Sequence, residues 1–338
     1  MARSDRRYHS TMRWCLLLLG CVFGLFAAIP GEGGVAIGDA VLRPIISEKE
    51  HNANLAIEAF ERDHATIRQL PFEQRRAREQ RMESSLQRLI DLASDTKAEN
   101  KALYLMAHWR FSYVDGKGTE PLLDRITRNP YPGFKNPADA LRVQLYLRQG
   151  RLGEARALAD RLAQSVPEFA GLQTLCAFYE RIGQPAPRTA GQPLGDSPAD
   201  PATRPEPWLL YHFTGALDAT QREVLGTLLN ELKSPAYAGV VRVVVVAEGS
   251  NPLALKGILN ELPGGDQIDL LWSNPGATGD AAAWRTAWGF PSVPTSVLLG
   301  PDRHIVAIEP TITDLRVIIG KKRAPTTNPG TSRSPKGG

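Results

Sequence analysis

The stretch WGFPSVPTSVLLGPDRHIVAIEP, residues 288–310, determines the fold predicted for the C-terminal part of the chain. It reads as the end of a helix, a loop at Val293, Pro294 and Thr295, an apolar strand, a Gly-Pro-Asp turn and a second strand. Turn residues between two short apolar runs indicate a β-hairpin. The hairpin is expected to be part of a larger sheet, and the other strands of that sheet are expected in the residues that precede it.

The elements upstream of this hairpin alternate between strands and helices. GVVRVVVVAEG at 239–249 is rich in valine, as expected of a central strand that is buried on both faces. Further strands are expected at 208–213 and 267–272, and helices at 218–234, 251–262, 280–290 and 313–322. This order predicts an α/β sandwich with a mixed sheet over residues 207–322.

This order of elements, together with SVPTSVLLGPDRHIV, resembles the thioredoxin-like superfamily. The most similar type is the TlpA/ResA group of exported thiol–disulfide oxidoreductases. The resemblance implies that Pro294 is a cis proline and that the backbone beside it pairs with an extended substrate. A cis X-Pro bond costs only about 0.5–1 kcal/mol over trans, so such a loop is accessible to this sequence.

The resemblance also implies a Cys-x-x-Cys pair where the first strand meets the long helix, and that pair is missing. The matching segment, YHFTGALDATQRE, places Leu217, Asp218, Ala219 and Thr220 at those four positions. Thiol exchange requires a thiolate, so the family's redox activity is not expected here. The resemblance then implies a vestigial binding groove without catalytic residues, formed by Thr214, Leu217, Asp218, Ala219, Thr220, Val293, Pro294 and Thr295.

Cysteine usage agrees with this interpretation. The three cysteines are Cys15, Cys21 and Cys176, and no CxxC occurs anywhere in the sequence. Cysteine-based zinc sites and disulfide frameworks are therefore excluded. Cys176 lies in a helical pattern and is best interpreted as a small buried apolar residue.

Residues 40–183 are predicted to be helical and repeat-like. PADALRVQLYLRQGRLGEARALADRLAQS has two amphipathic helices that are separated at Gly150, and it resembles one tetratricopeptide repeat unit. A third helix at 170–181 would begin another unit. Such hairpins bind peptides or partner proteins, and a packed helical spacer is the other interpretation.

The remaining segments complete the predicted domain organisation. Residues 1–36 combine four arginines with an uncharged run at 14–29, which indicates a signal peptide or a membrane anchor. LLGC at 18–21 leaves lipoprotein processing open. Residues 184–206 are rich in proline and are expected to be an extended or disordered linker. Residues 323–338 form a disordered basic tail.

Several function classes are excluded by missing motifs. The sequence has no G-x-S-x-G, H-E-x-x-H, P-loop or G-x-G-x-x-G before a helix, and its six histidines lack ligand spacing. Neither a metal nor another cofactor is expected. The net charge of +4 comes largely from the tail, so nucleic acid is not an expected partner.

Three hypotheses follow from these observations. The first is a redox-inactive binding or scaffold protein with a protein or peptide partner, exported to the periplasm or to the outer face of the cytoplasmic membrane. It would contact the membrane through residues 1–36 if they are not cleaved. The alternative is a thiol–disulfide oxidoreductase of the TlpA/ResA type that relies on a partner's cysteines or on Cys176. In the third, the thioredoxin-like part is a structural cap on a helical peptide-binding module.

Overall fold

The structure is a computed structural model, which describes residues 47–67, 72–114, 116–188, 192–194, 197–198, 200–215, 219–234, 237, 239–248, 251–262, 268–273, 287–289 and 295–323. The predicted signal peptide or anchor lies outside these residues, and so does the basic tail beyond Arg323. Within the described ranges, no helix is long and apolar enough to cross a membrane.

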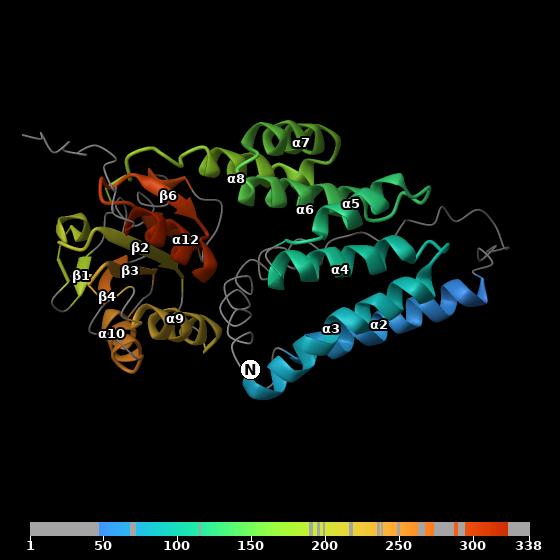
Figure 1. Ribbon diagram of the computed structural model, residues 1–338, viewed down its shortest axis with the longest axis horizontal. Helices are drawn as coiled ribbons and strands as arrows, with labels where there is room; N and C mark the ends of the chain where they lie inside the picture. The colour runs from blue at the N-terminus through green and yellow to red at the C-terminus, as the bar shows by residue number, and fades with distance from the viewer. Residues whose placement is uncertain are drawn as a thin grey trace, which may run out of the picture.

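The N-terminal half is an array of helices in which each helix packs on the next one along the chain (Figure 1). Its members are α2 (Glu48–Ile67), α3 (Phe72–Ala93), α4 (Glu99–Tyr113), α5 (Thr119–Arg128), α6 (Lys135–Arg148), α7 (Leu152–Ser165) and α8 (Gly171–Tyr179). Helices α4, α6 and α8 begin at residues 99, 135 and 171, so a helix pair recurs every 36 residues. This spacing is close to the roughly 34 residues of a tetratricopeptide unit and fits the repeat-like prediction.

Helix α5 is a helix that the sequence pattern did not predict. It is short, and its buried face consists of Thr119, Leu123 and Ile126. Spacings of three and four residues place these side chains on one side of the helix. The pattern is short because ten residues allow less than three turns, and so it does not stand out in the sequence.

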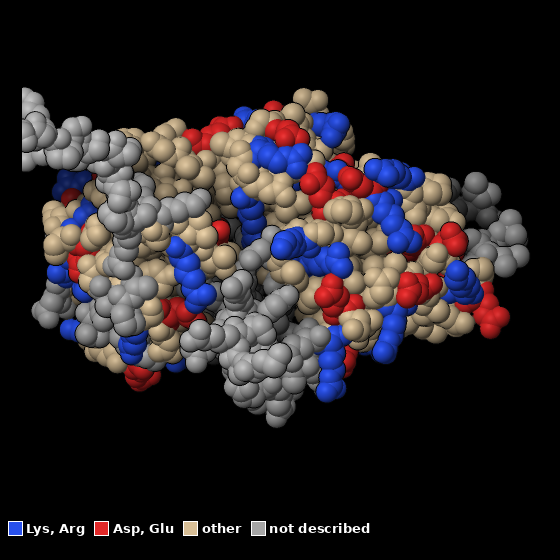
Figure 2. All heavy atoms as spheres, viewed as in Figure 1, with Lys and Arg blue, Asp and Glu red and all other residues tan. Residues whose placement is uncertain are grey.

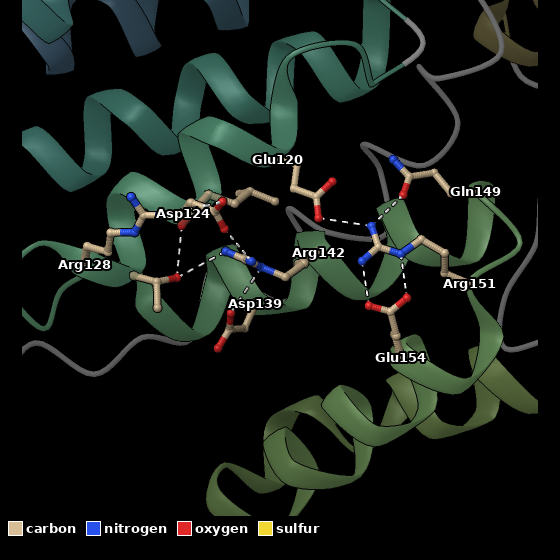
Figure 3. A network of polar contacts seen from close by, with 10 residues as sticks. Glu120, Asp124, Arg128, Asp139, Arg142, Gln149, Arg151 and Glu154 are labelled. Carbon is tan, nitrogen blue, oxygen red and sulfur yellow. Dashed lines mark hydrogen bonds and ion pairs between the residues drawn. The ribbon is translucent and has the colours of Figure 1, made fainter.

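Charged side chains hold α5, α6 and α7 together (Figure 3). Arg142 of α6 binds Asp124 of α5 over 2.7 Å. Arg151 binds Glu120 of α5 over 3.0 Å and Glu154 of α7 over 2.6 Å, while its guanidinium lies over the ring of Tyr146. Lys and Arg are interspersed with Asp and Glu over the visible face of this half (Figure 2). These ion pairs therefore belong to the packing between neighbouring helices.

The C-terminal half is built on a six-stranded mixed sheet, which confirms the predicted α/β sandwich. In chain order the strands are β1 (Gln192–Leu194), β2 (Trp208–Thr214), β3 (Val241–Glu248), β4 (Ile268–Ser273), β5 (Thr295–Leu299) and β6 (Ile305–Ile308). Their order in the sheet is β1-β4-β3-β2-β5-β6. Strands β2, β3 and β4 are parallel, whereas β1, β5 and β6 run antiparallel to their neighbours.

Helices α9 (Ala219–Leu232), α10 (Pro252–Asn260) and α12 (Ile312–Arg323) cover one face of the sheet. Their leucines and isoleucines meet the side chains of alternate strand residues, among them Trp208, Leu210 and Val243. Side chains alternate between the two faces of a strand, so the intervening residues Leu209, Tyr211 and Phe213 point to the opposite face.

The helical array itself covers this opposite face. Phe178 and Tyr179 of α8 and Leu158 of α7 share one buried core with Phe213 of β2 and with Trp288. Arg181, just after α8, also donates a hydrogen bond to the carbonyl oxygen of Ala287 over 2.6 Å. The two halves are thus joined by apolar burial and not only by the chain between them.

The residues predicted as a linker, 184–206, line both edges of the sheet in their described parts. Pro185 bridges to His304 beside β6, and residues 192–194 form β1 on β4 at the other edge. Arg303, with φ at +61°, donates hydrogen bonds to the carbonyl oxygens of Ala202, Arg204 and Glu206. Residues 192–194 are extended, whereas Pro201–Thr203 form a 3-10 turn, and the contacts above hold these described parts against the sheet. The domain boundaries drawn from the sequence stay predictions.

Candidate groove at the end of strands β2 and β5

The two flanks of the predicted groove lie at the same end of neighbouring strands. Thr214 is the last residue of β2, Thr295 is the first residue of β5, and both are buried. The antiparallel register pairs Phe213 with Thr295, which brings the two flanks together. Ala219 and Thr220 begin α9. Leu217, Asp218, Val293 and Pro294 lie outside the described residues, so the groove as a whole stays a prediction.

Glu309 is the polar residue at this site that the sequence analysis missed. The hydroxyl of Thr295 donates a hydrogen bond to Glu309 Oε1, and the backbone N–H of Ser296 donates to the same oxygen over 3.0 Å. The backbone N–H of Glu309 in turn donates to the carbonyl oxygen of Ser296 over 2.8 Å. Glu309 therefore extends the ladder between β5 and β6 by one residue and fixes the start of β5.

The backbone of Glu309 is in the left-handed region, with φ at +50°. Residues other than glycine rarely adopt this conformation, and such outliers often mark functional sites. A glutamate at the end of a strand gives no local signal of this geometry. The acidic side chain at this position is explained by its hydrogen-bond donors, Thr295 and Ser296, which are distant in the sequence.

Arg148, at the end of α6, is the charged neighbour of Glu309 from the helical array. Burial raises the pKa of Glu309, and the hydrogen bonds from Thr295 and Ser296 and the charge of Arg148 offset only part of this rise. The guanidinium of Arg148 lies 3.8 Å from the ring centroid of Phe111 and donates to the Phe111 carbonyl oxygen over 2.9 Å. Both charged groups are therefore held in place by other residues.

A second polar pair lies on the other face of the same strands. His212 Nδ1 is 3.0 Å from the Ser296 hydroxyl, and both residues are completely buried. Burial lowers the pKa of His212 to about 4, so its imidazole is neutral near pH 7. The pair lies on the sheet face that α9, α10 and α12 cover, and we assign it to packing.

Cys176, the cysteine of the described part of the chain, lies in the core that joins the two halves. Its side chain is 1% exposed, and burial raises the pKa of its thiol to about 11. A reactive cysteine requires a lowered pKa and some exposure. The geometry therefore agrees with the prediction of a small buried apolar residue. Within the described ranges, no group of three His, Cys, Asp or Glu side chains could hold a metal ion.

The strand order and the helices on the sheet define a thioredoxin-like α/β fold, preceded by a helical array. No protein-family model and no curated protein matches the chain. Solved structures do resemble it. The thioredoxin domain of a thiol-disulfide oxidoreductase from Bacteroides vulgatus is 19% identical and covers 42% of this chain and 96% of its own, with a TM-score of 0.34.

Two further solved structures come from the same genus. A thioredoxin-like protein from Bacteroides caccae is 11% identical, over 72% of this chain and 84% of its own, with a TM-score of 0.36. A thiol-disulfide oxidoreductase from Bacteroides fragilis is 17% identical, over 34% and 80%, with a TM-score of 0.25. The assignment of the fold rests on the strand order and connections described above.

Proposed function

We propose that this protein is a redox-inactive binding or scaffold protein of the cell envelope, which uses the groove at the end of β2 and β5 to hold a polypeptide partner. The observation that carries the proposal is the pairing of a thioredoxin-like fold with a sequence that contains no Cys-x-x-Cys. Leu217, Asp218, Ala219 and Thr220 stand where the resemblance implies the cysteine pair. None of these side chains can exchange a disulfide.

The alternative, an oxidoreductase that uses Cys176, is less well supported. Its thiol is buried between helices, and its pKa of about 11 leaves about one thiolate in ten thousand molecules at pH 7. An unperturbed cysteine has about one in thirty. Recruitment of Cys176 would also require part of the core between the two halves to open.

Turnover of a disulfide substrate by the full chain is the test of the redox part of the proposal. The purified protein is mixed with insulin and dithiothreitol, and the precipitation of reduced insulin chains is recorded beside a thioredoxin control. We expect the rate of dithiothreitol alone, unchanged by Cys176→Ala. If the wild-type protein accelerates the precipitation of insulin and Cys176→Ala abolishes this acceleration, the oxidoreductase alternative is established instead.

The location in the envelope rests on residues 1–36, with their basic start and their apolar run. Alkaline phosphatase, which is active only after export, can be fused behind residue 46 of the chain. We expect activity from this fusion and none from a matched fusion that begins at residue 37. Activity from neither fusion would overturn the proposed location.

A further inference from the structure

Arg181 joins the helical array to the residues that lead into β5. It lies two positions after α8, and its Nη1 donates a hydrogen bond over 2.6 Å to the main-chain carbonyl oxygen of Ala287. Ala287 and Trp288 are helical, and Gly289 follows as a turn. The last carbonyl groups of a helix have no partner within that helix, and a cation near them is stabilising. The helical array thus caps the end of a helix in the other half of the molecule.

Gly289 shows how closely Arg181 approaches this helix end. Its φ of +67° lies in the left-handed region, which often ends helices and which favours glycine. A Cβ atom at this position would lie 3.3 Å from Nη1 of Arg181, which is tighter than an ordinary contact. The lack of a side chain therefore allows both the turn and the close approach of the guanidinium.

Trp288, between the two residues that Arg181 approaches, is held by both halves of the molecule. Its side chain is completely buried, and its ring centroid lies 4.9 Å from that of Phe213 and 5.4 Å from that of Tyr211. It also shares a core with Phe178 of α8. The buried indole N–H has no hydrogen-bond acceptor in the described part of the chain. Ring packing therefore fixes the side chain, whereas the hydrogen bond from Arg181 fixes the main chain beside it.

These contacts lie close in sequence to the predicted groove. Five residues, among them Pro294, separate Gly289 from Thr295, the first residue of β5. Thr295 is fixed by its place opposite Phe213 in the sheet. The contact with Arg181 therefore determines where the chain enters this short segment, and the sheet determines where the chain leaves it. Five residues leave little chain that could absorb a shift at the entry.

From these contacts we infer that Arg181 is a positioning residue, through which the helical array sets the entry of the chain into the predicted groove. The inference rests on the proposed function and deepens it, because it makes the affinity of the groove depend on the helical array. Without the hydrogen bond from Arg181 the helix end can shift, and only a fraction of the molecules keeps the form that binds. The apparent affinity falls by the same fraction.

Three variants test the role of Arg181. Arg181→Met removes the donor and keeps an unbranched apolar stem. Loss of one hydrogen bond to a charged group corresponds to about a tenfold change in an equilibrium, so we expect about tenfold weaker binding. Arg181→Lys keeps the charge and a donor, and it should restore most of the affinity. Arg128→Met is the matched control, because the side chain of Arg128 in the helical array is 83% exposed.

Binding is measured on the full chain by fluorescence anisotropy, with carboxymethylated, permanently unfolded α-lactalbumin as the probe, and chemical denaturation of each variant is recorded in parallel. A bond that only stabilises the fold changes the free energy of unfolding, but it does not change the affinity of a protein that is fully folded in the assay. We expect similar affinities for the wild type, Arg128→Met and Arg181→Lys, and about tenfold weaker binding by folded Arg181→Met.

Hydrogen exchange of the free protein provides a second measurement, which does not depend on binding. If Arg181 positions the entry to β5, Arg181→Met accelerates exchange in residues 287–289 and at the start of β5 more than in β3. A bond that only adds stability to the whole fold accelerates exchange equally in these regions, because their amides then exchange through the same global unfolding. Arg128→Met should accelerate neither.

The outcomes separate the two proposals. If the wild type binds and Arg181→Met binds equally well, the positioning role is wrong and the binding function stands. If the wild type does not bind the unfolded probe, the proposed polypeptide binding is overturned, and hydrogen exchange decides on Arg181. Equal acceleration in β3 and β5 then overturns the positioning role, and acceleration confined to residues 287–289 and β5 supports it.

Discussion

Arg204 donates two hydrogen bonds to Asp269, from Nε to Oδ2 over 2.9 Å and from Nη2 to Oδ1 over 2.6 Å. Arg242 of β3 adds a third over 2.9 Å, and the Asp269 side chain is completely buried. Burial alone would raise the pKa of Asp269, but the two arginines outweigh it, and the pKa lies below its usual range. The connecting segment is thereby tied through a charged group to β4, the strand next to the β1 edge of the sheet.

Asp269→Asn is expected to destabilise the protein, because it leaves two arginines facing an uncharged amide. Removal of one partner of a buried ion pair costs about 3 kcal/mol in the free energy of unfolding, here at the lower end of the usual range because both arginines are partly exposed. Chemical denaturation measures the change. Asp91→Asn, on the exposed side of α3, should stay within about 0.5 kcal/mol of the wild type. An equal effect of both substitutions would contradict the prediction.

Phe178→Ala tests whether the two halves unfold together. The ring is 1% exposed in the core that joins α8 to the sheet, so its loss should cost about 3–5 kcal/mol. Hydrogen exchange should then accelerate both in α4 and in β3. Leu253→Ala, at a side chain 77% exposed, is the control and should change neither. Faster exchange in one half only would indicate two independent folding units.

Native Cys176 is expected to resist thiol reagents. In a Cys15→Ser, Cys21→Ser background, reaction with Ellman's reagent at pH 7 should be slow and should become fast when denaturant unfolds the chain. The reason is the burial that raises the pKa of this thiol to about 11. Rapid labelling of the folded protein would show that the junction between the halves opens readily.

Because burial lowers the pKa of His212, we expect the free energy of unfolding to depend on pH. Its native pKa of about 4 lies below the value of about 6.5 for an unfolded histidine, so only the unfolded chain gains a proton between these values. The free energy of unfolding should therefore fall as the pH drops from 6.5 to 4, by up to about 3 kcal/mol.

His212→Asn, which can still bond Ser296, should remove most of this slope. His304→Gln, at a half-buried position in the turn before β6, should retain it. Denaturation at pH 7, 5.5 and 4 provides the comparison. A slope that persists in His212→Asn would assign the pH dependence to other groups.

The sheet and most helices could be predicted because their signals are local. The valine run of β3 and the turn residues before β6 specify strands without knowledge of their neighbours. The roles of Phe178, Arg204 and Glu309 could not be predicted, since each depends on a partner far away in the sequence. The sequence predicts a helix at 170–181, which contains Phe178, but it does not show that a sheet covers this side chain. The prolines of 184–206 predict extended backbone, but not the pairing of that backbone with both sheet edges.

Because α8 shares a buried core with the sheet, further helix pairs can be added to the helical array at its N-terminal end but not behind α8. Pairs of helices recur every 36 residues, and stacked repeats of this kind tolerate duplication because each unit contacts only its neighbours. The α8 end is closed, because a new pair behind it would separate Phe178 and Tyr179 from β2. Duplication of α4 and α5 should therefore lengthen the array without loss of folding, whereas an insertion after residue 182 should not be accepted.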